Sequence, residues 1–368
     1  MASVREQERR ELLRWLDHGL RAGREGRLEA EFAPVLHQGD PAAECQQHVL
    51  VREGEKHASH CLTRTITVEA LGRRLELGMI GMVYTDPAFR GRGAARLAIE
   101  AGIDRLREQG ASVAVLWSDL DSFYTRQGFH RAGIENFYVI DRELVRRAQL
   151  AADDSIEVRP AQPHDWFELE TLYASKPTRH VREQGELRRL AAAPDSRTCV
   201  AVREERVLAY ASMGRGDDLG GVVHEWAGDP AGVGACIETF ACELDELIVL
   251  EGPIHERATV ALRRAGARPN PGSFGLMRIL DVDAVWESLS EGTEALADMR
   301  LTCSDASDAE FVFEMPGRRF PLSAPNALSL LFGPALPRSL ALGLNAATRN
   351  AIGRHLPWPL FIWGFDSI

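Results

Sequence analysis

Residues 74–110, RLELGMIGMVYTDPAFRGRGAARLAIEAGIDRLREQG, contain the pattern that decides the fold of this chain. A mostly apolar run from Arg74 to Thr85 predicts a strand. Asp86-Pro87 ends that strand, and a glycine-containing turn follows from Arg90 to Gly93. From Ala94 to Gln109, apolar residues recur at helical spacing, and Gly110 stands where a C-cap glycine is expected. The order of strand, glycine turn and helix predicts an α/β unit.

The turn Arg90-Gly91-Arg92-Gly93-Ala94-Ala95 has the composition of an anion-binding loop. Glycine lets the backbone approach a diphosphate closely. The helix that follows presents free N–H groups and the positive end of its dipole, and successive amides in such a turn form a nest for an anion. Since Arg90 and Arg92 add positive charge, the sequence predicts a pyrophosphate site at the start of this helix.

The neighbouring segments extend this unit into a mixed sheet flanked by helices. Strands are predicted at Gln47–Arg52 and His57–Val68, and short glycine-containing turns make them an antiparallel meander with the strand that ends at Thr85. The run Ala111–Trp117 is almost continuously apolar, as a strand covered on both faces should be, and we expect it to pair in parallel with that same strand. A short helix, Ser122–Gln127, follows.

The order of predicted elements repeats between Ile156 and Gly266, which indicates one diverged internal duplication. Where the second segment should have its glycine turn, it reads GDPAGVG over residues 228–234, which contains no arginine, and Asp229 would repel a phosphate. We therefore expect a structural role for this segment. His224 and Glu225 lie on one of its predicted strands and are interpreted as an ordinary half-buried pair, although they could face a cleft.

Composition and charge narrow the function further. The 368 residues are 45% hydrophobic and 26% charged, which is ordinary for a soluble globular protein. Acidic residues outnumber basic ones, 54 to 43, without a long basic run, so nucleic-acid binding is not expected. Apolar runs stay shorter than the ~20 residues of a membrane span. Scattered cysteines and a charged N-terminus without a signal core predict a cytoplasmic protein, and the sequence shows no metal-ligand spacing.

Two linked motifs resemble those of the GNAT superfamily of acetyltransferases. The family's pyrophosphate motif, Gln/Arg-x-x-Gly-x-Gly/Ala, is matched by Arg90, Gly93 and Ala95, and the segment FYTRQGF over residues 123–129 is similar to the family's helix and turn. An unrelated or Rossmann-like phosphate loop is the alternative. The resemblance implies acetyl-CoA as co-substrate, with pantetheine paired to the strand that ends at Thr85. The residues implied in cofactor binding are Val83, Tyr84, Thr85, Arg90, Gly91, Arg92, Gly93, Ala94, Ala95, Arg96, Asp119 and Leu120.

The resemblance also implies a general acid. The family's tyrosine at this point protonates the leaving thiolate, which makes Tyr124 the candidate here. A phenol with a pKa near ~10 is protonated at neutral pH and suits that task. The alternative is a packing tyrosine. Asp86, Asp119, Asp121, His130 and Glu135 lie in or near the motifs as candidate bases, although most are expected to be solvated loop residues.

Another base is suggested by the end of the chain, LPWPLFIWGFDSI over residues 356–368, because an aromatic, apolar terminus is unusual and should dock. Two GNAT-like units followed by a smaller segment resemble the enhanced intracellular survival family of acetyltransferases, in which the terminal carboxylate acts as the base. That role would fall to Ile368; alternatively, the tail only packs on the third domain. The last segment is shorter than in that family, and the terminal residue differs.

The sequence therefore predicts a mixed α/β fold with tandem GNAT units. The expected domains are 1–152, catalytic and acyl-CoA-binding; 153–290, degenerate; and 291–368, a small α+β domain with its tail reaching the active site, which the resemblance implies is sterol-carrier-like. The expected function is acetyl transfer from acetyl-CoA to a small amine or peptide acceptor. A non-catalytic acyl-CoA sensor or scaffold is the rival, and a longer acyl donor is a further alternative. We expect no metal, membrane or nucleic-acid partner, and a homo-oligomer is left open.

Overall fold

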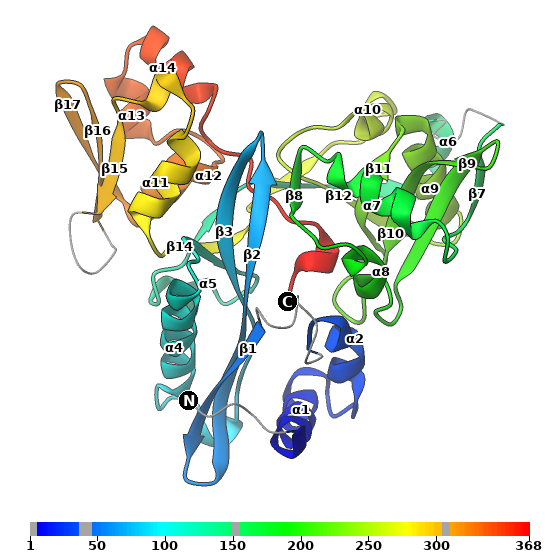
Figure 1. The fold of residues 1–368 in the computed structure, drawn as a ribbon, viewed down its shortest axis with the longest axis horizontal. Coiled ribbons are helices and arrows are strands. Elements are labelled where there is room, and N and C mark those ends of the chain that lie inside the picture. Colours follow the sequence, from blue (N-terminus) through cyan, green and yellow to red (C-terminus); the bar gives the residue numbers. More distant parts are fainter. Residues whose placement is uncertain (1–5, 37–45, 149–154, 304–309) are drawn as a thin grey trace. The chain divides into compact units, whose positions relative to one another are not determined.

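A computed structural model describes residues 6–36, 46–148, 155–303 and 310–368 (Figure 1). The chain forms two compact units, and neither is continuous in sequence. Unit 1 comprises Met1–Gly133, Ser273–Pro359 and Ile368, whereas unit 2 comprises Ile134–Gly272 and Leu360–Ser367. The three domains predicted from the sequence stay a prediction.

Unit 1 is built around a mixed sheet in which six of its strands follow the order β1-β2-β3-β4-β14-β5. These strands are β1 (Gln46–Glu53), β2 (Lys56–Ala70), β3 (Arg73–Thr85), β4 (Val113–Leu116), β14 (Gly275–Ile279) and β5 (His130–Ala132). The predicted antiparallel meander and the predicted parallel pair of β3 and β4 are both confirmed. The parallel pairing runs only from Leu77 to Met79, and β3 continues beyond it to Thr85.

Helices cover this sheet and set the position of the glycine turn. Helix α4 (Ala94–Glu108) buries Ile99, Ile103 and Leu106 against the sheet, and it packs on β2 and β3. Its Gly102 permits close approach, because a Cβ there would lie 3.0 Å from Cys61 Sγ. The remaining N-terminal elements are α1 (Glu6–Leu20), α2 (Arg27–Leu36), η1 (Pro87–Phe89) and α5 (Asp121–Thr125).

The C-terminal part of unit 1 forms a small α+β arrangement. A three-stranded antiparallel sheet, β15-β16-β17, is joined by helices, and α12 packs on β5 and β14. The elements are α11 (Val282–Ser290), η2 (Glu294–Leu296), β15 (Arg300–Cys303), β16 (Glu310–Met315), β17 (Arg318–Ser323), α12 (Ala324–Phe332), α13 (Arg338–Gly343) and α14 (Ala346–Gly353). Its likeness to sterol-carrier proteins stays a prediction.

Unit 2 has a second mixed sheet, in the order β13-β6-β12-β11-β10-β9-β7. A parallel pair, β11 and β12, is joined through α9, just as β3 and β4 are joined through α4. Its elements are β6 (Glu135–Asp141), α6 (Arg142–Ala148), β7 (Glu157–Pro160), α7 (Trp166–Ala174), β8 (Thr178–His180), α8 (Glu186–Leu190), β9 (Arg197–Arg203), β10 (Arg206–Met213), β11 (Val222–Gly228), α9 (Pro230–Ala241), β12 (Glu246–Glu251), α10 (Arg257–Arg264), β13 (Asn270–Gly272) and η3 (Gly364–Asp366). The repeated order of elements is thus present in both units.

Each sheet contains one strand that cannot be assigned to it from the order of elements in the sequence. Strand β6 follows the elements of unit 1 in sequence but pairs with β12 from Asn136 to Asp141. Strand β14 follows unit 2 in sequence but lies between β4 and β5 in the sheet of unit 1. Both units therefore depend on a chain that crosses from one to the other and back.

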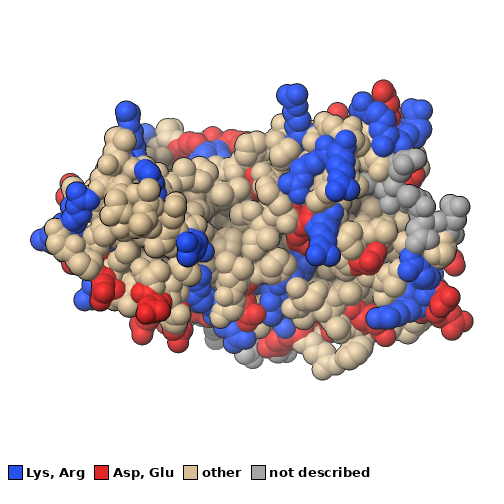
Figure 2. Space-filling view, turned by 90° about the horizontal axis from the view of Figure 1, so that it is seen from above, with Lys and Arg blue, Asp and Glu red and all other residues tan. Residues whose placement is uncertain are grey.

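Acidic and basic side chains are interspersed on the face drawn in Figure 2. The net charge of −11 does not gather there into a patch of one sign. Of the helices in the described ranges, none combines the length and the apolar character that crossing a membrane requires.

Candidate active site

A cavity of about 740 Å³ opens in unit 1 where β3 runs on beyond its pairing with β4. The glycine turn, the start of α4, the end of β3 and helix α5 meet around it. Its lining residues are Gly19, Leu20, Val83, Tyr84, Thr85, Phe89, Arg90, Gly91, Gly93, Ala94, Ala95, Arg96, Leu120, Phe123, Tyr124 and Arg126. Most of the residues that the sequence predicted for cofactor binding are thus brought together here; Arg92 and Asp119 are not among the lining residues.

The glycine turn has the backbone that an anion nest requires. Gly91 and Gly93 have φ values of 73° and 84°, in the left-handed region that glycine adopts at little cost. Gly93 is the N-cap of α4, and the first turn of that helix carries no acidic side chain. The first N–H groups of a helix lack partners within it, so those of Ala94 to Arg96 are oriented to receive an anion.

The two arginines of the turn are held differently. Arg90 donates from Nε to the carbonyl oxygen of Thr85, at 3.2 Å, and lines the cavity. The Arg92 guanidinium lies 3.7 Å from the Glu53 carboxylate and 5.8 Å from the centre of the Phe89 ring. Of the two arginines of the turn, Arg90 therefore lines the cavity, as Arg96 and Arg126 also do, whereas Arg92 contacts Glu53 and Phe89.

Strand β3 is distorted immediately beside the cavity. Met82 has a φ of 47°, which is uncommon for a residue other than glycine, and the pairing with β2 shifts register between His60 and Leu62. Such a bulge turns the strand and re-aims the groups that follow it. The next residues, Val83 to Thr85, line the cavity. Their backbone groups are thus directed by an irregularity that the sequence pattern does not reveal.

A pair of histidines, the buried His60 and the half-buried His48, supports this bulge. His60 Nδ1 lies 3.0 Å from the carbonyl oxygen of Met82, and His60 Nε2 lies 2.9 Å from His48 Nδ1. Burial lowers the pKa of His60 to about 3, with His48 as a further cause, so its ring is neutral. Because a carbonyl only accepts, His60 donates from Nδ1 to Met82 and accepts from the Nδ1–H of His48. Sequence reasoning missed this pair, since two histidines on neighbouring strands leave no motif.

Tyr124 lies on α5 and lines the cavity, with 5% of its surface exposed. The rings of Phe123 and Phe129 meet it edge to face, at 4.9 and 6.2 Å between centres. Burial raises the pKa of Tyr124 to about 12, and Cys61 adds to that shift while a hydrogen bond with Ser118 opposes it. The phenol therefore keeps its proton at neutral pH, so it can act as a proton donor.

The end of the chain reaches the strand that carries the bulge. A Cβ added to Gly81 would lie 2.5 Å from the terminal carbonyl oxygen of Ile368 and 2.6 Å from its carbon. The carboxyl group therefore packs on β3 directly before Met82, and only a glycine leaves room for it.

The other candidate bases are occupied or lie elsewhere. Asp86 caps η1, accepting from the Ala88 N–H at 2.8 Å and from Trp15 Nε1 at 3.4 Å. Asp121 pairs with Arg131 at 2.6 Å, and that hydrogen bond lowers its pKa. Burial lowers the pKa of His130.

Two further carboxylates complete the set of candidates. Glu135 belongs to unit 2, where burial raises its pKa to about 7. Asp119 is exposed and does not line the cavity. Within the described ranges, no three His, Cys, Asp or Glu side chains are arranged to hold a metal ion.

Helix α1 contributes a wall that the sequence analysis did not assign to the site. Gly19 and Leu20 line the cavity, and a Cβ on Gly19 would lie 2.2 Å from the Tyr84 ring. The Trp15 ring packs edge to face on the same tyrosine, with 4.7 Å between centres. A glycine near the end of an amphipathic helix was the available signal, because it marks a place of close contact.

Residues 3–132 match the model of a known family, the acetyltransferase (GNAT) domain. This segment is about a third of the chain and contains every residue that lines the cavity. No curated protein matches the sequence.

Solved structures share the fold over nearly the full length. A GCN5-related N-acetyltransferase from Anabaena variabilis has a TM-score of 0.71 at 16% identity, covering 99% of this chain and 98% of its own. A conserved protein from Enterococcus faecalis, described as a probable N-acyltransferase, has a TM-score of 0.70 at 13% identity, with coverage of 97% and 96%. Eis1 from Mycobacterium abscessus has a TM-score of 0.60 at 15% identity, with coverage of 95% and 98%. At these identities the likeness shows the mixed α/β fold alone, which is the fold class predicted from the sequence.

Proposed function

We propose that this chain transfers an acetyl group from acetyl-CoA directly to an amine acceptor, a small amine or a peptide, without an acyl-enzyme. The observation that carries the proposal is the cavity in which the glycine turn and the Tyr124 phenol meet. It combines an anion nest, an unpaired strand edge and a proton donor, which are the three parts needed to bind a CoA thioester and release its thiol. The match of residues 3–132 to an acetyltransferase domain supports it.

In the proposed complex, the amides from Gly91 to Arg96 hold the pyrophosphate and Arg90 adds charge. Pantetheine pairs with the edge of β3 along Val83 to Thr85, where β4 no longer pairs with it. A backbone N–H after the bulge donates to the thioester carbonyl and stabilises the negative charge that develops on its oxygen.

The proposed chemistry forms a carbon–nitrogen bond, breaks a carbon–sulfur bond and moves two protons. The acceptor nitrogen attacks the carbonyl carbon, the carbon–sulfur bond breaks, and Tyr124 gives its proton to the leaving thiolate. The proton lost by the nitrogen passes to the carboxylate of Ile368, which packs on Gly81. The Ile368 carboxyl group then releases its proton to solvent and the Tyr124 phenolate takes one up from solvent, so that both groups are restored.

The first experiment measures thiol release from acetyl-CoA across a panel of amines, together with acetyl-CoA affinity. Tyr124→Phe should lower kcat by about 10²–10⁴-fold with little change in affinity. Tyr138→Phe is the matched control, because it removes a buried hydroxyl in unit 2 that bonds to Glu251 at 2.8 Å. A Tyr124→Phe variant with unchanged kcat would refute the proposed acid.

The same measurements separate the rival function. Tight binding of acetyl-CoA without transfer to any amine would favour a non-catalytic acyl-CoA sensor or scaffold. Faster transfer from longer thioesters would assign the cavity to a longer acyl donor. Failure to bind any acyl-CoA would overturn the proposal.

A further inference from the structure

Most of residues 360–366, just before the end of the chain, are buried as deeply as a core strand. Leu360–Ser367 belongs to unit 2, and the side chains from Leu360 to Trp363, with Phe365 and Asp366, are at most 4% exposed. Chain ends are usually exposed and frayed unless they are tied down. A carboxylate at 0% exposure, two residues from the terminus, requires specific partners because an unpaired buried charge is very costly.

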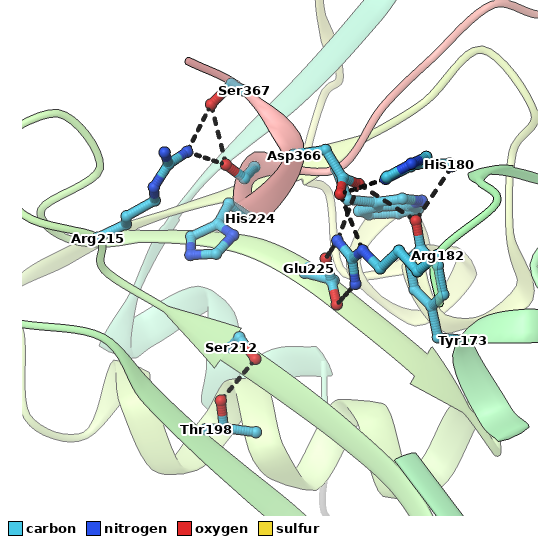
Figure 3. A network of polar contacts seen from close by, with 12 residues as sticks. Tyr173, His180, Arg182, Thr198, Ser212, Arg215, His224, Glu225, Asp366 and Ser367 are labelled. Carbon is cyan, nitrogen blue, oxygen red and sulfur yellow. Dashed lines mark hydrogen bonds and ion pairs between the residues drawn. The ribbon is translucent and has the colours of Figure 1, made fainter. Parts of the chain in front are cut away.

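Asp366 has those partners (Figure 3). Arg182 donates to it from Nε and Nη2, each at 2.8 Å, and His180 Nδ1 lies at 3.0 Å. The Tyr173 hydroxyl donates at 3.2 Å. Burial alone would raise the pKa of Asp366, but Arg182 and His180 hold it well below its ordinary value. The carboxylate is thus ionised and fully engaged.

Arg182 also holds a carboxylate of unit 2 itself. It donates to both oxygens of Glu225, at 2.9 and 2.6 Å, and the Tyr210 hydroxyl donates to the same group at 2.9 Å. One guanidinium therefore lies between a carboxylate of the sheet and a carboxylate of the tail. The sequence interpretation of Glu225 as half-buried is wrong, because it is 0% exposed within this network.

A second group of contacts fixes the tail around Gly364. Arg215 donates from Nη1 to the Gly364 carbonyl oxygen at 2.7 Å and to Ser367 Oγ at 2.9 Å. A Cβ on Gly364 would lie 2.6 Å from His224, whose ring meets Phe365 edge to face at 4.6 Å. These contacts involve Gly364, Phe365 and Ser367, so the tail can bind to unit 2 in only one register.

We propose that unit 2 is the binding site for the chain's own C-terminal segment, and that Arg182 is a positioning residue that fixes the terminal carboxyl group through Asp366. Only two residues separate Asp366 from the end, at most about 7 Å of extended chain. Greater mobility of Asp366 would therefore make the Ile368 carboxyl group more mobile as well. The catalytic consequence rests on the proposed function, whereas the docking does not.

The test uses the full chain and two near-isosteric changes on the two sides of Arg182. Asp366→Asn removes the charge of the tail, and Glu225→Gln removes the equivalent charge of the sheet. Hydrogen exchange is followed by mass spectrometry on a peptide covering the last residues, with far-UV circular dichroism to establish that each variant is folded. Asp366→Asn should exchange at least about tenfold faster in the tail, as expected for the loss of about 1.4 kcal/mol in local stability. Glu225→Gln should leave tail exchange close to wild type, since Arg182 keeps its bonds to Asp366.

A milder variant covers the case in which Asp366→Asn does not fold. Ser367→Ala removes one of the Arg215 contacts and should accelerate tail exchange by a smaller factor. Equal exchange in wild type, Asp366→Asn and Ser367→Ala would overturn the docking site. Equal acceleration by Asp366→Asn and Glu225→Gln would overturn the specific role of the Arg182–Asp366 contact.

Kinetics form a separate arm. If the chain transfers acetyl groups, Asp366→Asn should lower kcat at least about tenfold while KM for acetyl-CoA stays within twofold, because the cavity belongs to unit 1. Unchanged kcat with a loosened tail would overturn the positioning role alone. A wild type without transferase activity would refute the proposed function, and the exchange experiment would still decide the docking.

Discussion

His60 is the residue whose ionisation should most clearly affect unit 1. Its pKa in the folded protein is about 3, below its ordinary value of 6.5. A lowered histidine pKa stabilises the fold above pH 6.5, where both states are neutral, and that stability is lost as pH falls from 6.5 toward 3. The slope is at most about 1.4 kcal/mol per pH unit for one proton.

His60→Gln should therefore flatten the decline of the thermal midpoint of the wild type between pH 6.5 and pH 4. His224, whose pKa is also about 3, keeps its own contribution in both proteins. Thermal unfolding at half-unit pH steps checks this. Curves of equal slope for wild type and His60→Gln would show that His60 does not ionise on unfolding in this range.

At the scale of the element, the two glycines at the ends of α4 allow an effect on acetyl-CoA binding to be distinguished from an effect on stability. Gly93 at its start and Gly110 after its end have φ values of 84° and 83°, and a Cβ on either would meet nothing within 4 Å. An alanine at either position should cost about 1–2 kcal/mol in stability through backbone strain alone.

Of these two glycines, Gly93 lines the cavity and Gly110 does not. Gly93→Ala should therefore weaken acetyl-CoA binding at least about tenfold, because strain would displace the amides of the nest, whereas Gly110→Ala should leave affinity unchanged. Denaturant unfolding and calorimetric titration measure the two effects. Equal affinities in the two variants would remove the glycine turn from the binding site.

The same elements show what the sequence can and cannot predict. Local signals sufficed for β3, the glycine turn, α4 and the parallel pairing, because strand composition, turn residues and helical periodicity all act over a few residues. The bulge at Met82 and the histidine pair beside it depend on contacts among three strands, two histidine side chains and a backbone carbonyl, so no local pattern predicts them. The predicted roles of Tyr124 and Ile368 came from family resemblance, and they stay predictions.

At the scale of the molecule, the exchange of β6 and β14 limits how the chain can be divided. A fragment ending at residue 152 would keep β4 and β5 but lose β14, which pairs with both. The same fragment would retain β6, whose partner β12 it lacks. Exposed strand edges of this kind promote aggregation, and the missing β14 removes apolar contacts at Leu276 and Met277. We expect the fragment 1–152 to aggregate.

The contact between Gly133 and Phe274 suggests another way to shorten the chain to unit 1. A Cβ on Gly133 would lie 2.7 Å from the Phe274 Cβ, so the two ends of the crossing are neighbours within unit 1. A chain in which a short glycine–serine linker replaces residues 134–272, ending at Pro359, keeps the six strands β1, β2, β3, β4, β14 and β5. It should unfold cooperatively and bind acetyl-CoA with near-native affinity, because every residue of the cavity remains.

Without Ile368 this chain lacks the proposed base, so its transfer rate should fall well below that of the full protein even though binding persists. Calorimetric titration and thiol release measure the two properties on one sample, with fragment 1–152 as the comparison. If 1–152 folded and bound acetyl-CoA as well as the linked chain, β14 would be dispensable and the three predicted domains would be supported. If the linked chain kept full activity, neither the tail nor its binding site in unit 2 would be needed for catalysis.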